Sequence, residues 1–123
     1  MAIYVTRLFV RFARRSGLGK DVLRRIGRDV TAGRIDVDLR GGVLKQRIAR
    51  RVGGKSGGFR VLILFRRGSN LFYVDGFAKN ARSNIDAVEL AALRWLADQY
   101  LEASTASLCK FVECGELEII DGH

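Results

Sequence analysis

The sequence of 123 residues contains no proline, one histidine and two cysteines. The histidine, His123, is the final residue, and Cys109 and Cys114 lie five positions apart, which on a helix points them to nearly opposite faces. No cluster of histidine, cysteine or carboxylate has the spacing of metal ligands, and a single histidine excludes a two-histidine nuclease. We therefore expect no metal, no cofactor and no local disulfide, and we interpret both cysteines as ordinary helix residues.

Long hydrophobic runs are also missing. No apolar stretch approaches the roughly 18 residues that span a bilayer, and the start MAIYVTRLFVRFARR lacks the continuous apolar stretch and the cleavage site of a secretory signal. We therefore expect a cytoplasmic protein with no membrane partner. Hydrophobic residues still make up 48% of the chain, so we expect a folded core and, at this length, one domain over residues 1–123.

Acidic residues are scarce in the part of the chain where basic residues gather. The chain holds 22 Lys and Arg against 13 Asp and Glu, a net charge of +9. Residues 39–74 contain nine basic residues and no acid, whereas residues 84–121 contain eight acids and two bases. This asymmetry indicates a polyanionic partner, which could be a nucleic acid, an anionic membrane surface or an acidic protein.

The spacing of apolar residues predicts an α+β fold. Two amphipathic helices are expected within about 6–33, and alternation predicts an antiparallel sheet of three strands within about 43–77. Helical spacing returns within about 84–114, with Ser83 or Asn84 as the predicted cap, and a short terminal strand is expected at about 116–120. The acidic tail is interpreted as an edge strand, with folding back onto the basic surface as the alternative.

A glycine-rich segment, VGGKSGGFR at residues 52–60, stands between the first two strands. Its Gly-Lys-Ser resembles the end of a nucleotide-binding P-loop, but that motif opens a helix, whereas this segment leads into a strand. We interpret it as a hairpin connection. If the flanking strands pair, Lys45, Arg47 and Arg60 can share one face of the sheet, where three cations are costly unless an anion binds there. The alternative is a merely solvated basic face.

Two further cations and one acid lie near the end of the third strand. Lys79 and Arg82 stand where this strand leaves the sheet for a helix, a favoured place for an anion, although Arg82 could equally brace the helix. The acid is Asp75, and one carboxylate cannot make a general acid/base pair. Carboxylate-pair chemistry is therefore not expected.

The segments GGVLKQRIARRVGGKSGGFRVLILFR and YVDGFAKNARSNI resemble the RelE/ParE superfamily of toxins from bacterial type II toxin-antitoxin modules. The similarity is strongest to the RelE/HigB-like branch, which carries K-Q-R, G-K-S-G-G-[FY]-R and G-F-A-K-N blocks. It implies two N-terminal helices packed on a small twisted antiparallel sheet, followed by a C-terminal helix. It also implies an mRNA interferase that cuts translated mRNA in the ribosomal A site, without metal, and a cognate antitoxin, expected to be a helix-turn-helix protein.

The resemblance assigns roles to individual residues. Lys45 or Arg47 is expected to transfer protons and Arg60 to stabilise the charge of the transition state. The residues expected to contact RNA are Lys79, Arg82, Arg50, Arg51 and Lys55. RelE proper has an arginine at the position of Asn80 and a catalytic tyrosine near Asp86, which this chain lacks, so the general acid stays open.

Two other functions share parts of this pattern. A ParE-like inhibitor of DNA gyrase has the same fold but needs no phosphate-sized cluster of cations. A non-enzymatic module would bind RNA or DNA with strong salt dependence and without cleavage.

Overall fold

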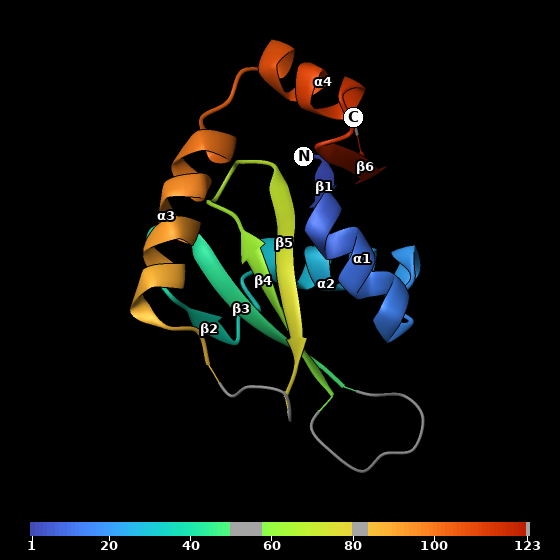
Figure 1. Ribbon diagram of the computed structural model, residues 1–123, viewed down its shortest axis with the longest axis vertical. Coiled ribbons are helices and arrows are strands. Elements are labelled where there is room, and N and C mark those ends of the chain that lie inside the picture. The colour runs from blue at the N-terminus through green and yellow to red at the C-terminus, as the bar shows by residue number, and fades with distance from the viewer. Residues whose placement is uncertain (50–57, 80–83, 123) are drawn as a thin grey trace.

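The computed structural model describes residues 1–49, 58–79 and 84–122. The elements in chain order are β1 (Ile3–Thr6), α1 (Arg7–Ser16), α2 (Lys20–Thr31), β2 (Val37–Asp38), β3 (Val43–Ile48), β4 (Phe59–Leu64), β5 (Leu71–Ala78), α3 (Ala87–Leu101), α4 (Thr105–Glu113) and β6 (Leu117–Asp121). Figure 1 shows the sheet between α1 and α2 on one side and α3 on the other. The α+β class is therefore as predicted. The prediction of a single domain over residues 1–123 stays a prediction.

The described strands form one six-stranded sheet in the order β2-β3-β4-β5-β1-β6. The neighbours β3, β4 and β5 run antiparallel, which confirms the predicted three-strand meander. β1 lies between β5 and β6 and runs parallel to β5, so the expectation of a wholly antiparallel sheet is wrong at this pair. β6 forms the edge beyond β1, as the edge-strand interpretation of the acidic tail predicts.

β1 is the element that the sequence pattern did not reveal. All four of its residues are buried, so the strand shows no alternation of apolar and polar side chains, and it passes directly into α1. The boundary is marked by Thr6, whose Oγ1 accepts a hydrogen bond from the Phe9 N–H at 3.2 Å and so caps the helix. The available signal was the strand propensity of the run IYVT.

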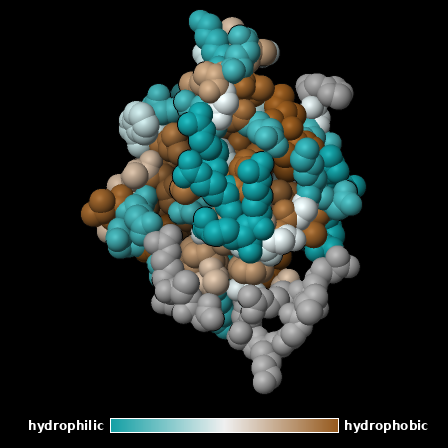
Figure 2. Space-filling model, turned by 45° about the vertical axis from the view of Figure 1, so that its right-hand side comes forward, coloured by the Kyte–Doolittle hydropathy of each residue, from teal (hydrophilic) through white to brown (hydrophobic). Residues whose placement is uncertain are grey.

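α1 and α2 cover one face of the sheet. Phe9 and Phe12 of α1 are buried, and the Phe9 ring stacks on Tyr73 of β5 with centroids 4.9 Å apart. The arginines of α1 lie on the opposite side of the helix, and Figure 2 shows hydrophilic side chains over this side of the molecule. Gly17 ends the helix with φ at 70°, a conformation that glycine adopts without strain. The two N-terminal helices therefore pack on the sheet, as expected.

α3 and α4 build a second core on the other face. Ala97 and Tyr100 of α3 are buried, and Tyr100 stacks on Phe72 of β5 with ring centroids 5.1 Å apart. The cap of α3 is Asp86, whose carboxylate accepts a hydrogen bond from the Glu89 N–H at 2.8 Å, so the predicted cap at Ser83 or Asn84 is wrong. Because both faces of the sheet are covered, β4 is apolar on both sides over residues 61–64.

Candidate active site

Lys45, Arg47 and Arg60 lie on the α3 side of the sheet, and we call these three residues the basic face. Arg47 of β3 stands directly opposite Arg60 of β4, and Lys45 is opposite Leu62. Alternation then sets their direction, because Leu44 and Ile48 belong to the core under α1 and α2 whereas Val43 and Leu62 belong to the core under α3. The three cations therefore lie on one face of the sheet, as predicted.

The register places two positive charges side by side. Side chains directly opposite on antiparallel strands have Cβ atoms about 4.5–5.5 Å apart, and like charges there destabilise the sheet. Arg60 is half-buried, and its Nη1 donates to the Phe59 carbonyl at 3.3 Å. An anion bound between the two guanidinium groups would relieve their repulsion.

Three arginines elsewhere in the described residues pair with acids. Arg66 pairs with Asp98 at 2.6 Å, Arg34 with Asp29 at 3.0 Å, and Arg24 with Asp21 at 3.1 Å. Within residues 1–49, 58–79 and 84–122, no ion pair shorter than 4.0 Å joins Lys45 or Arg47 to an acid. These two charges are therefore available to a ligand, in contrast to those of Arg24, Arg34 and Arg66.

The start of α3 reaches the basic face. Lys45 Nζ lies 3.5 Å from Asn84 Oδ1, which also accepts a hydrogen bond from the Ile85 N–H at 3.0 Å. The contact positions the lysine ammonium without removing its charge. The segment before α3 and the middle of β3 thus meet at one place, although 39 positions separate them in the sequence.

Asp75 also lies on the α3 side, which sequence reasoning missed. The pairing of β4 with β5 shifts between Leu62 and Ile63, so Val74 and Asp75 stand on the same side of the strand. A Cβ at the next residue, Gly76, would overlap the ring of Phe12 in α1, which fixes that position to the opposite face. Such a bulge redirects side chains near functional sites, and no local sequence signal gives its position.

Of the five residues predicted to contact RNA, the structure describes only Lys79. Lys79 is exposed directly after β5, and its backbone N–H donates to the Gly58 carbonyl at 3.1 Å, which ties it to the same end of the sheet as Arg60. Four predicted residues lie outside the described residues: Arg50, Arg51, Lys55 and Arg82. Their roles stay predictions.

The chain matches the family model described as the RelE toxin of the RelE/RelB toxin-antitoxin system, over residues 1–120. The chain belongs to the RelE toxin family. A comparison with curated proteins found no match. Membership makes this RelE-family chain a toxin of a type II toxin-antitoxin system and implies a cognate antitoxin as its partner.

The described part of the RelE-family chain holds neither a metal-binding cluster nor a membrane-spanning helix. Residues 1–49, 58–79 and 84–122 contain no group of three or more His, Cys, Asp or Glu that could hold a metal ion. Across the same ranges, the helices are all too short or too polar to cross a membrane. The two cysteines are exposed and unbonded to each other.

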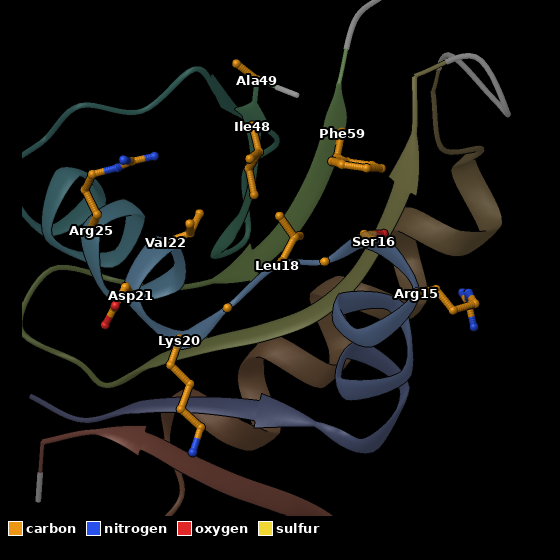
Figure 3. Close-up of a pocket in the computed structure, with 12 residues that line it drawn as sticks. Arg15, Ser16, Leu18, Lys20, Asp21, Val22, Arg25, Ile48, Ala49 and Phe59 are labelled. Carbon is orange, nitrogen blue, oxygen red and sulfur yellow. The ribbon is translucent and has the colours of Figure 1, made fainter. Parts of the chain in front are cut away.

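A cleft with a volume of about 880 Å³ lies on the α1 and α2 side of the sheet. Figure 3 shows it between the turn that joins α1 to α2 and the ends of β3 and β4, with Leu18, Val22, Ile48 and Phe59 toward its middle. Arg15 and Lys20 extend away from it. Ile48 and Phe59 pair with each other one position beyond Arg47 and Arg60, so the cleft lies behind the basic face and does not include it.

Tyr73 does not replace the missing catalytic tyrosine. Its hydroxyl donates to the Leu23 carbonyl of α2 at 2.6 Å, in the core away from the basic face. Burial raises the pKa of the Tyr73 phenol above its ordinary value, and the nearby charge of Asp29 raises it further. The hydroxyl is therefore a buried structural donor.

We expect Tyr73→Phe to lower the free energy of unfolding by about 1 kcal/mol, because one buried hydrogen bond is lost while the ring stays in place. Toxicity after induction should not change, since the hydroxyl faces α2. Urea unfolding measures the first effect and growth after induction the second. Loss of toxicity in a variant that keeps its fold would contradict this placement.

Proposed function

We propose that this chain is a metal-independent endoribonuclease that cuts translated mRNA on the ribosome. The observation that carries the proposal is the basic face, where Arg47 stands opposite Arg60 and Lys45 lies on the same side two positions along β3. A phosphate that is being cleaved gathers negative charge on its oxygens, and fixed cations stabilise that charge more than they stabilise the ground state.

The chemistry follows from the groups available. The 2′-hydroxyl of the RNA attacks the adjacent phosphorus, the bond from phosphorus to the 5′-oxygen breaks, and the products are a cyclic phosphate and a free 5′-hydroxyl. The 2′-hydroxyl proton must leave and the 5′-oxygen must gain one. We assign proton transfer to Lys45 or Arg47 and charge stabilisation to Arg60, while Lys79, Arg82, Arg50, Arg51 and Lys55 contact RNA phosphates.

The surroundings support strong electrostatics at this position. Leu62 and Phe77, which flank Arg60 on the same side of the sheet, are 0% and 6% exposed. Cations beside buried apolar side chains attract a bound anion more strongly than cations surrounded by water, because the local dielectric constant is lower. A gyrase inhibitor has no need of such a cluster, which favours RNA over gyrase as the target.

The test is primer extension on mRNA taken shortly after induction of the toxin. Cleavage within translated codons is expected, and the bands should weaken strongly in Lys45→Ala but not in Lys110→Ala, an exposed lysine on α4 that serves as the matched control. Intact mRNA in growth-arrested cells would contradict the proposal. If the same cells showed induction of the DNA-damage response, the gyrase alternative would replace it.

A further inference from the structure

α3 carries an exposed apolar stripe, which we define as Val88, Ala91, Ala92 and Trp95. All four side chains face solvent, and Val88 and Trp95 are 80% and 64% exposed. Their spacing of three, four and seven positions places them on one side of the helix. The opposite side, with Ala97 and Tyr100, packs on the sheet, so α3 is apolar on both sides although the sheet covers only one.

The orientation of α3 is fixed, so the stripe does not belong to a helix that could turn inward. Arg94 Nη2 donates to the Leu39 carbonyl at 2.6 Å on one flank. Farther along, Asp98 accepts from Arg66 Nη2 at 2.6 Å. These contacts tie the helix to the ends of β3 and β4, and they hold the stripe outward.

More apolar surface adjoins the stripe. Leu96 follows Trp95, is half-buried, and lines a shallow cavity of about 390 Å³ together with Leu8 of α1, which is 54% exposed. A partner helix with anchors at matching positions could cover the stripe and place one side chain in this cavity. Exposed apolar surface of this kind marks an interaction site.

The stripe and the basic face adjoin each other. Val88 lies in the first turn of α3, four positions after Asn84, and the Asn84 side chain contacts Lys45. A partner segment that leaves the stripe at this end therefore arrives at three cations. Charge complementarity requires that the arriving segment be acidic.

We propose that the stripe is the docking surface for the cognate antitoxin, which lays an apolar helix on α3 and continues with an acidic segment over the basic face. The antitoxin is implied by family membership, so the proposal does not depend on the endoribonuclease activity. A second copy of this chain fits poorly, because each copy carries +9 and the two would repel each other.

Trp95 is the single tryptophan of the chain and therefore reports on the stripe. The probe is the purified small protein encoded beside the toxin that suppresses its toxicity. Its tryptophans, if present, are replaced by phenylalanine. Adding it should shift the Trp95 emission to shorter wavelength, because the indole leaves water. An unshifted emission at saturating antitoxin would overturn the proposal.

Two variants measure the affinity of the stripe. Trp95→Ala and Val88→Asp should weaken antitoxin binding roughly 10- to 100-fold, as expected for anchor residues, with thermal stability unchanged because both side chains are exposed. Ile119→Ala, which removes an apolar side chain 40% exposed on β6, is the matched control and should bind normally. Equal affinity of all three variants would overturn the proposal.

Salt and toxicity complete the test. Raising the salt concentration from about 0.1 M to about 0.5 M should weaken binding through the acidic segment, and the factor lost in Trp95→Ala should be the same at both concentrations. In cells, Trp95→Ala should stay toxic and escape neutralisation. Concentration-dependent dimerisation of the toxin alone, abolished by Val88→Asp, would assign the stripe to a second copy instead and overturn the proposal.

Discussion

Replacing Arg60 by alanine is expected to slow mRNA cleavage on the ribosome about 100- to 1,000-fold, the usual cost of removing one group that stabilises transition-state charge. The structural reason is that Arg47 stands opposite Arg60, so the pair can hold a phosphate from two sides. Single-turnover cleavage of a programmed ribosome complex measures the rate without a contribution from product release.

The free energy of unfolding of Arg60→Ala shows whether its cleavage rate falls because catalysis is impaired or because the protein unfolds. Urea unfolding shows whether Arg60→Ala keeps its fold, and the loss of rate counts as catalytic only where the free energy of unfolding is retained. Arg60→Lys should restore part of the rate, since it keeps the charge and loses the planar fork of donors. Arg67→Ala, at the other end of β4 in the turn to β5, is the matched control and should cleave normally. Full activity of Arg60→Ala would remove Arg60 from the proposed mechanism.

The largest effect on stability is expected from Phe9→Ala. Phe9 is 0% exposed and its ring packs between Phe12 of α1 and Tyr73 of β5. Truncation leaves a cavity that the rigid strand cannot fill, at a cost of about 3–5 kcal/mol. That is a large fraction of the roughly 5–15 kcal/mol by which a domain is stable.

Urea unfolding of Phe9→Ala and of Leu8→Ala makes the comparison within one helix. Leu8 is the preceding residue and is 54% exposed, so its truncation should cost less than about 1 kcal/mol. The midpoint should fall strongly for Phe9→Ala and little for Leu8→Ala. Equal losses would contradict the assignment of Phe9 to the core beneath α1.

Part of the fold could be predicted because its signals are local. The helical spacing of α1 and α2 and the alternation of β3 place each side chain relative to its neighbours in the chain, so the sharing of one face by Lys45 and Arg47 followed from their spacing. β1 could not be found in this way. It is buried on both faces, and its place between β5 and β6 comes from partners about 70 and 115 positions away.

The candidate site, too, could be predicted from the sequence only in part. The amino-acid sequence alone shows which residues are cationic, that Lys45 and Arg47 share a face, and that the chain carries the K-Q-R and G-F-A-K-N blocks of its family. The tertiary structure adds that Arg60 stands opposite Arg47, that a shift in strand pairing turns Asp75 to the same side, and that Trp95 stays exposed on the outer side of α3. The physical reason is that charge and periodicity are properties of neighbouring residues, whereas register, bulges and the uncovered side of a helix depend on which distant segments pack together.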